Sequence, residues 1–201
     1  YAKKDAASTS FTAHNVVADE AEDNDLAYDA STGGIGIAYY DYNSSDAKFA
    51  FIEVPGTVST PTTEPSGEVG GGIALAFDST GTPFVVYWDD SNQRIRAGYW
   101  TGTSWSLTTL STAPSYTYNV GGIDVVFDGE DTLHAVYSYQ VAALHLGYYS
   151  TRNNAGTWST STFGESGDDV YEVSIALDSL DLPHVAYHDD EEYDLIYAYL
   201  Y

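Results

Sequence analysis

Paired acidic side chains are the residues of this sequence best suited to chemistry. Asp89-Asp90 and Asp189-Asp190 each end an apolar run and stand before a polar turn. Hard cations such as calcium prefer clustered carboxylate and carbonyl oxygens. We therefore expect Asp89, Asp90, Asp189 and Asp190 to be the metal ligands if the chain binds calcium. The alternative is a solvated acidic surface that maintains solubility, because no EF-hand spacing or other dedicated calcium loop is present.

No residue set is marked out as catalytic. The chain has no cysteine, which excludes thiolate metal sites and cysteine nucleophiles. It also lacks a Gly-x-Ser-x-Gly elbow, and the glycines at 70–72 precede an apolar run rather than a phosphate-binding helix. Carboxylates are too numerous for one acid and base pair to stand out. We therefore predict no catalytic residues and a protein that is not an enzyme.

The charge excludes whole classes of partner. The 201 residues include 30 acidic and six basic ones, giving a net charge of −24 at pH 7 with histidine neutral. Such a charge repels nucleic-acid backbones and anionic lipid surfaces, so we expect no nucleic-acid partner and no membrane insertion. Cations and basic partners remain compatible with this negative charge. Disorder is excluded because 43% of the residues are hydrophobic and 15% are aromatic.

An internal repeat organises the chain. An apolar run ending in Asp, a short turn and a second apolar run ending in an aromatic residue occur four times. The Asp anchors are spaced by 49, 50 and 50 residues and are Asp29, Asp78, Asp128 and Asp178. Because Asp at a turn bonds its own backbone, we interpret the anchors as turn caps. His134 and His184 hold equivalent places in the third and fourth repeats, where backbone bonding is favoured over a two-histidine metal site.

Each repeat predicts four strands. Apolar residues alternate or form short runs, β-branched and aromatic types dominate, and turns recur about every 10 to 12 residues. Four-stranded units of about 40 to 50 residues are typical of propeller blades. We predict an all-β fold, a single β-propeller domain over residues 1–201 with four four-stranded antiparallel blades. The expected ranges are 1–17 for a closing outer strand and 18–66, 67–116, 117–166 and 167–201 for the blades.

The two ends of the chain complement each other. The fourth repeat lacks an outer strand, whereas residues 9–17 form an outer strand without a blade of its own. Pairing of 9–17 with the edge 195–200 would close a ring within one chain, and effective concentration favours this arrangement. The same pairing between neighbouring molecules would give a head-to-tail polymer by strand addition. A third alternative is that the chain is an excised part of a larger propeller.

A four-stranded blade places its loops on two opposite faces. We label the four strands of each blade a to d in chain order. The b–c loops within blades and the d–a loops between blades share one face and carry most of the acidic residues. Lys3, Lys4 and Arg152 fall in c–d turns on the other. We therefore expect one face of the molecule to be strongly negative.

The repeats also carry a family resemblance. The segments AFDSTGTPFVVYWDD, GYWTGTSWS, ALDSLDLPHVAYHDD and LIYAYL resemble the repeats of secreted bacterial and archaeal β-propellers of the sialidase-like class. The resemblance implies an extracellular or cell-surface protein. It does not imply catalysis, because the Asp-box Ser-x-Asp-x-Gly-x-Thr-Trp is absent and Arg94, Arg96 and Arg152 are too few for the family's arginine cluster.

These observations favour a non-enzymatic extracellular propeller with a structural or interaction role, self-assembling by exchange of its terminal strands. The alternative is a carbohydrate- or cation-dependent adhesive propeller of lectin type. Its sugar-stacking candidates are Trp88, Trp100, Tyr116 and Tyr118. A glycan hydrolase or lyase is the least favoured function.

Overall fold

The computed structural model describes residues 2–3, 12–13, 15–16, 20–53, 57–59, 69–112 and 120–200. Strands and turns account for this part of the chain, and no helix in it is long and apolar enough to cross a membrane. The predicted all-β class is confirmed.

Four antiparallel sheets follow one another along the sequence, and we call them blades 1 to 4. Blade 1 contains β3 (Ala21–Tyr28), β4 (Ile35–Asp41), β5 (Asp46–Glu53) and β6 (Thr57–Ser59). Blade 2 contains β7 (Val69–Phe77), β8 (Pro83–Asp89), β9 (Arg94–Trp100) and β10 (Trp105–Thr112). Blade 3 contains β11 (Val120–Phe127), β12 (Leu133–Val141), β13 (Leu144–Arg152) and β14 (Trp158–Phe163). Blade 4 contains β15 (Val170–Leu177), β16 (Pro183–Asp189) and β17 (Asp194–Tyr199).

Short turns set the register within each blade. The turn between the first two strands needs one residue with a left-handed backbone, and this residue is Gly81 in blade 2 (φ 82°), Asp131 in blade 3 (φ 59°) and Asp181 in blade 4 (φ 60°). Glycine adopts this conformation without strain, and aspartate tolerates it better than most residues. Blade 1, whose turn is one residue longer, uses Gly33 (φ 77°).

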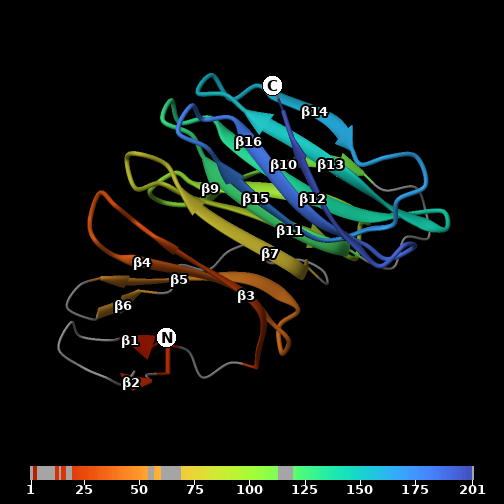
Figure 1. The fold of residues 1–201 in the computed structure, drawn as a ribbon. Coiled ribbons are helices and arrows are strands. Elements are labelled where there is room, and N and C mark those ends of the chain that lie inside the picture. The colour runs from red at the N-terminus through yellow and green to blue at the C-terminus, as the bar shows by residue number, and fades with distance from the viewer. Residues whose placement is uncertain are drawn as a thin grey trace.

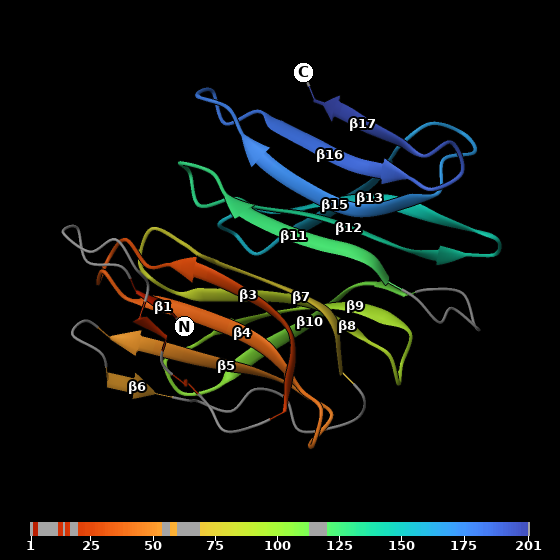
Figure 2. The ribbon, with the colours of Figure 1, turned by 60° about the horizontal axis from the view of Figure 1, so that its bottom comes forward.

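The blades stack face to face through their first strands, so that β3, β7, β11 and β15 lie in sequence across the molecule (Figures 1 and 2). Three apolar clusters fill the spaces between blades 1 and 2, 2 and 3, and 3 and 4. The contact between blades 2 and 3 includes Phe84 against Phe127, with ring centroids 5.0 Å apart. At the equivalent place between blades 1 and 2, Gly36 leaves room for Phe77, whose ring lies 2.6 Å from where a Cβ would stand. Packing between adjacent faces is therefore the main source of stability.

The four sheets do not close into a ring. Blade 1 and the N-terminus lie at one end of the stack, whereas blade 4 and the C-terminus lie at the other (Figures 1 and 2). Of the predicted closing strand 9–17, Thr12 and Ala13 form β2 (Thr12–Ala13), which pairs with β1 (Ala2–Lys3) in a separate two-stranded sheet. In the described residues β17 pairs with β16 alone, so the predicted completion of blade 4 by the N-terminal strand is not what the structure shows.

The stacking of the blades predicts which leucines carry stability. Leu133 is fully buried in the cluster between blades 2 and 3, whereas Leu180 is 75% exposed in a turn. We expect Leu133→Ala to lower the free energy of unfolding by about 2–5 kcal/mol in urea titrations, because it leaves a cavity. The matched change Leu180→Ala should cost less than about 0.5 kcal/mol. Equal losses for the two variants would contradict the packing described here.

Candidate functional site

The Asp anchors cap turns, as the sequence analysis interpreted them. The Asp78 carboxylate accepts hydrogen bonds from the backbone amides of Thr80 and Thr82, both at 2.9 Å. The Asp178 carboxylate accepts the equivalent bonds from Leu180 and Leu182, at 2.7 and 3.0 Å. These carboxylates are occupied in fixing the turn.

The first member of each predicted metal-binding pair is buried. The Asp89 carboxylate accepts hydrogen bonds from Asn92 and from Arg94 Nε, the latter at 2.6 Å. The Asp189 carboxylate accepts bonds from the amides of Asp169 (3.0 Å) and Glu191 (3.1 Å). Both side chains thus cap the hairpin that follows them.

The second members lie closer to solvent. Asp90 accepts a hydrogen bond from Trp88 Nε1 at 3.1 Å, and Asp190 lies 3.9 Å from His188 Nδ1. Within the described ranges no group of three or more histidine and acidic residues is arranged to hold a metal ion. Calcium binding by Asp89, Asp90, Asp189 and Asp190 stays a prediction.

The two repeat histidines each belong to a three-residue set. In blade 3, His134 Nδ1 lies 2.6 Å from the Tyr149 hydroxyl and Nε2 lies 3.2 Å from Asp128. Burial, with a smaller contribution from the negative charge of Asp128, raises the pKa of Tyr149 to about 12, so this hydroxyl stays protonated near neutral pH. The histidine therefore bonds side chains, not the backbone as the sequence analysis favoured.

Blade 4 repeats the same set at equivalent positions. His184 Nδ1 lies 2.5 Å from the Tyr197 hydroxyl, and Nε2 lies 3.6 Å from Asp178. The ring of His184 also stacks with those of Tyr197 and Tyr199, at centroid distances of 5.8 and 6.2 Å. Unlike its counterpart in blade 3, this set is partly open to solvent.

The face of the molecule that carries the b–c and d–a loops holds an acidic pocket between blades 3 and 4. Its volume is about 680 Å³ and its lining combines the β12–β13 and β16–β17 turns with the loop before β15. The Tyr187 hydroxyl donates a 2.6 Å hydrogen bond to Asp168. Burial and this carboxylate raise the pKa of Tyr187, which keeps the hydroxyl protonated. The grouping of b–c and d–a loops agrees with the predicted negative face.

The opposite face, which carries the a–b and c–d turns, holds a pocket of about 650 Å³ between blades 2 and 3. We call it the Arg152 pocket. Four aromatic side chains line it together with threonines, Asn154 and the turn carboxylates Asp78 and Asp131. The four aromatics are Phe84, Tyr99, Trp100 and Phe127.

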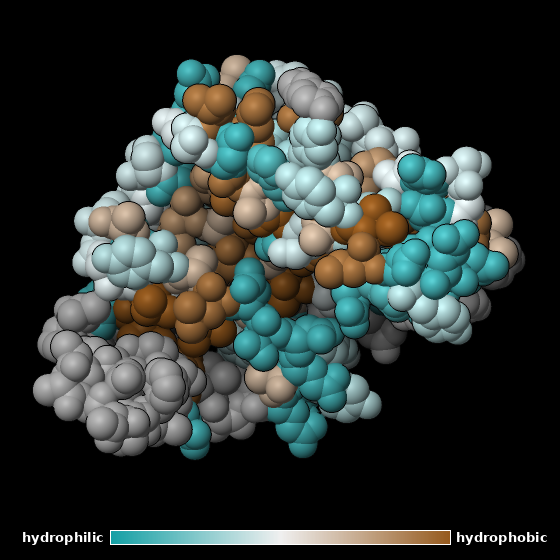
Figure 3. All heavy atoms as spheres, viewed as in Figure 1, coloured by the Kyte–Doolittle hydropathy of each residue, from teal (hydrophilic) through white to brown (hydrophobic). Residues whose placement is uncertain are grey.

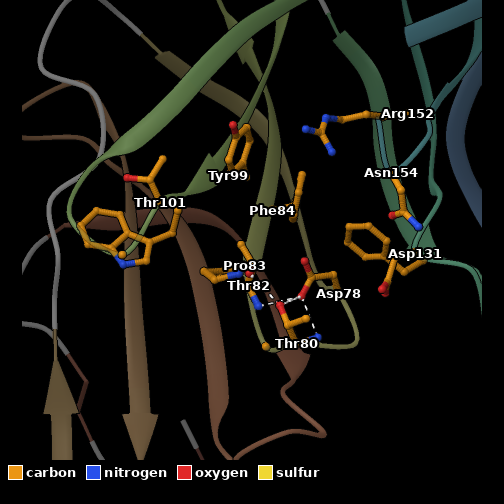
Figure 4. A pocket seen from close by; sticks show the side chains of 14 residues that line it. Asp78, Thr80, Thr82, Pro83, Phe84, Tyr99, Thr101, Asp131, Arg152 and Asn154 are labelled. Atoms are coloured by element: carbon orange, nitrogen blue, oxygen red, sulfur yellow. Dashed lines mark hydrogen bonds between the residues drawn. The ribbon is translucent and has the colours of Figure 1, made fainter. Parts of the chain in front are cut away.

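Arg152 is the feature that distinguishes this pocket. It ends β13 of blade 3 and extends toward two rings of blade 2, as Figure 4 shows. Its guanidinium carbon lies 5.3 Å from the centroid of Phe84 and 5.0 Å from that of Tyr99, within the range of cation–π attraction. In the described part of the chain no acidic side chain forms an ion pair with Arg152.

The two carboxylates that line the Arg152 pocket form hydrogen bonds with other residues. Asp78 is bonded to Thr80 and Thr82 (Figure 4). Asp131 accepts hydrogen bonds from the amide and hydroxyl of Ser79, both at 2.7 Å, and so links blade 3 to blade 2. The Arg152 pocket therefore offers a positive charge, aromatic faces and uncharged polar groups to a ligand, beside the carboxylates of Asp78 and Asp131.

The four aromatic residues expected to stack on sugars do not lie together in one site. Trp100 lines the Arg152 pocket, whereas Trp88 is buried between blades 2 and 3. Tyr116 and Tyr118 lie outside the described residues. Sequence reasoning missed the meeting of Arg152 with Phe84 and Tyr99, because the three come from adjacent blades and their distance depends on how the blades stack.

Comparison with known proteins supports the sialidase-like fold. No protein-family model and no curated protein sequence matches the chain. Among solved structures, the intramolecular trans-sialidase of Ruminococcus gnavus matches with a TM-score of 0.62 and 10% identity, over 90% of this chain and 42% of that one. A Hadza microbial sialidase matches with a TM-score of 0.66 and 12% identity, over 90% of this chain and 44% of that one. A polysaccharide lyase that acts on ulvan matches with a TM-score of 0.59 and 11% identity, over 81% of this chain and 50% of that one. The chain spans less than half the length of the first two.

These similarities correct one expectation. The sequence analysis predicted that the chain is not an enzyme, because no set of residues stood out as catalytic. Sialidases and a lyase are among the structural neighbours, so the fold is one that glycan-processing enzymes use. That finding contradicts the expectation and directs attention to glycans.

The anchor carboxylates predict an acid-dependent loss of stability. Burial raises the pKa of Asp128, but hydrogen bonds from the Thr132 amide, His134 and the Glu130 amide together hold it below the ordinary value of 3.8. The stabilisation is therefore complete above pH 3.8 and is lost as the pH falls through the lower folded-state pKa. Asp128→Ala should cost about 1–3 kcal/mol at pH 7 and progressively less below pH 3.8, measured by urea titration at each pH.

Glu130→Ala, at an exposed neighbouring position, is the control and should be nearly neutral at every pH. A cost for Asp128→Ala that stays constant down to pH 2 would contradict this assignment.

The calcium prediction can be tested by melting. If the Asp pairs bind calcium, millimolar calcium should raise the melting temperature, and a chelator should reverse the rise. Asp90→Asn combined with Asp190→Asn should abolish it, whereas Asp46→Asn should not. An unchanged melting temperature at millimolar calcium would show that these residues serve the hairpins alone.

Proposed function

We propose that this chain binds an acidic glycan in the Arg152 pocket, as the recognition site of an extracellular glycan-processing protein. The observation that carries the proposal is the guanidinium of Arg152, which stacks on two aromatic rings and has no acidic partner in the described residues. A planar guanidinium presents two parallel donors to a carboxylate or a sulfate.

In a chain with so many acidic residues, an arginine without an acidic partner indicates a binding role. With 30 acidic residues and six basic ones, most basic groups should find a carboxylate nearby. Lys48 pairs with Asp41, and Arg94 and Arg96 pair with Asp89. Arg152 is held among rings instead, which leaves its donors available to a ligand.

The rest of the pocket suits a sugar. Aromatic rings stack on the apolar faces of sugar rings, and Trp100 and Tyr99 offer such surfaces. Asn154 and Thr101 supply polar groups beside them. The volume of about 650 Å³ lies within the range of small-ligand sites.

The structural neighbours supply independent support for the ligand class. The Ruminococcus gnavus protein was solved with oseltamivir carboxylate and the ulvan lyase with a GlcA(1-4)Rha3S unit. Both ligands bear acidic groups. Because identity is near 10%, this similarity supports the ligand class and leaves the role of each residue to experiment.

Binding should depend on both the charge of Arg152 and the acid of the ligand. We expect calorimetric titration to show binding of an oligoglucuronate and no binding of its carboxyl-reduced counterpart. Arg152→Gln should weaken binding at least about tenfold, the loss of one charge-assisted hydrogen bond or more. Arg152→Lys should retain part of the affinity, because it keeps the charge but not the planar stack.

His188→Ala, next to the acidic β16–β17 turn of blade 4, is the control variant and should bind the oligoglucuronate as the parent chain does. Melting curves of each variant separate loss of binding from loss of fold. Mass spectrometry of the incubated oligosaccharide detects any cleavage. Unchanged affinity of Arg152→Gln, or equal affinity for the acidic and reduced sugars, would exclude the Arg152 pocket as the site.

A further inference from the structure

A second cavity adjoins the Arg152 pocket on the side of β10. Its volume is about 320 Å³, and Phe84, Tyr99 and Arg152 line both cavities. We call it the Ala97 cavity. Strands β9 and β10 of blade 2 and the β13–β14 turn of blade 3 supply the rest of its lining, which includes Ala97, Ser106, Thr108, Ala155, Gly156 and Trp158.

One difference between the repeats creates this cavity. At one place in the register of the second and third strands, blades 1, 3 and 4 carry an aromatic residue on the third strand, namely Phe49, Tyr149 and Tyr197. Blade 2 carries Ala97 at this place. Because alanine has no ring, the volume that a ring would occupy between blades 2 and 3 is left open.

The equivalent place in blades 1 and 3 is filled. The ring of Phe49 packs on Phe77 and Trp105 of blade 2, with centroid distances of 6.4 and 5.6 Å. Tyr149 bonds His134 and packs against the apolar cluster between blades 3 and 4. In Figure 3 hydrophobic side chains extend from blade 1 toward the sheets stacked on it. The cavity in blade 2 is therefore a departure from the packing used elsewhere in the repeat.

Arg152 is a second departure at the same contact between blades. Its place at the end of the third strand is held by the apolar residues Ile52 in blade 1 and Trp100 in blade 2. A Cβ at Gly156 would lie 3.3 Å from a terminal nitrogen of Arg152, so the glycine leaves room for the guanidinium. The positive charge thus lies at the border between the two cavities.

The Ala97 cavity suits an uncharged sugar unit. Among the described residues that line it, Arg152 alone is charged. Trp158 supplies an aromatic ring, and Ser106 and Thr108 supply hydroxyls that can bond those of a sugar. Thr108 is exposed, so the cavity opens to solvent. Its volume lies at the lower end of the range for small-ligand sites.

We infer that this site binds a glycan chain of at least two sugars, with an acidic unit in the Arg152 pocket and an uncharged unit next to it in the Ala97 cavity. The inference rests on the proposed function, because it extends the same site. The guanidinium contacts the acid of the first unit, whereas the second unit is held by ring and hydroxyl contacts. The ligand class is therefore a heteroglycan in which acidic and uncharged sugars are adjacent.

NMR titration of the full chain with three probes tests the inference. The probes are methyl glucuronide and two disaccharides, in which glucose either precedes or follows the glucuronic acid. We expect the parent chain to bind one of the disaccharides at least about tenfold more tightly than methyl glucuronide, because the glucose unit adds contacts in the Ala97 cavity. Arg152→Gln should weaken the binding of all three probes.

Variants that fill the cavity should remove the advantage of the disaccharide. Ala97→Phe introduces the ring that blade 1 carries, and it should bring the ratio of the two dissociation constants close to one. Thr108→Tyr should do the same from an exposed position, without the strain of enlarging a buried residue. Thr109→Tyr, on the opposite side of β10, is the matched control and should keep the parent's ratio. Melting curves confirm that each variant is folded.

The outcomes separate this inference from the proposed function. A parent chain that binds methyl glucuronide as tightly as both disaccharides would overturn the inference and leave the proposed function in place. An advantage of the disaccharide that Ala97→Phe and Thr108→Tyr both preserve would also overturn it. A parent chain that binds none of the three probes would contradict the proposed function and the inference together.

Discussion

Face-to-face packing between successive sheets is the constraint on which the rest of the structure depends. A single four-stranded antiparallel sheet cannot bury both of its faces alone. Stacking solves this for three contacts, each filled by side chains at equivalent places in the repeat. The Asp anchors and the left-handed turn residues support the stacking, since they fix the register that aligns each face with the next.

Hydrogen bonds between blades add to the contacts made by apolar packing. Asp25 of blade 1 accepts a bond from the Leu75 amide at 2.7 Å, and Asp124 of blade 3 accepts one from the Ile175 amide at 2.8 Å. Burial raises the pKa of Asp25, which shows that this bond is made in a poorly solvated place. Many of the acidic residues that give the chain its charge are thus structural, because they cap turns or join blades.

The repeat made the fold predictable from the sequence, but the residues of the Arg152 pocket could not be predicted from it. Regular spacing of Asp29, Asp78, Asp128 and Asp178 together with period-two alternation was enough to predict four sheets and their order. The sequence could not predict whether the sheets close, because closure depends on the angle between blades and no residue type encodes that angle alone. The prediction that strand 9–17 completes blade 4 came from matching counts of strands, and the structure pairs Thr12 and Ala13 with Ala2 and Lys3 instead. The sequence analysis counted Arg152 only among three arginines too few for a cluster. It missed the contact of Arg152 with Phe84 and Tyr99, since these two rings come from another blade.

The central claim is that successive blades pack face to face, which holds the turns of neighbouring blades in contact. Cysteine cross-linking measures this most directly, because the chain contains no cysteine of its own. Ser79→Cys combined with Asp131→Cys should form an intrachain disulfide on mild oxidation, because these side chains of blades 2 and 3 are hydrogen-bonded at 2.7 Å. The matched pair of Ser79→Cys with Asp181→Cys should not, because Asp181 lies in blade 4. Equal disulfide yields for the two pairs, or no disulfide in the first, would contradict the account.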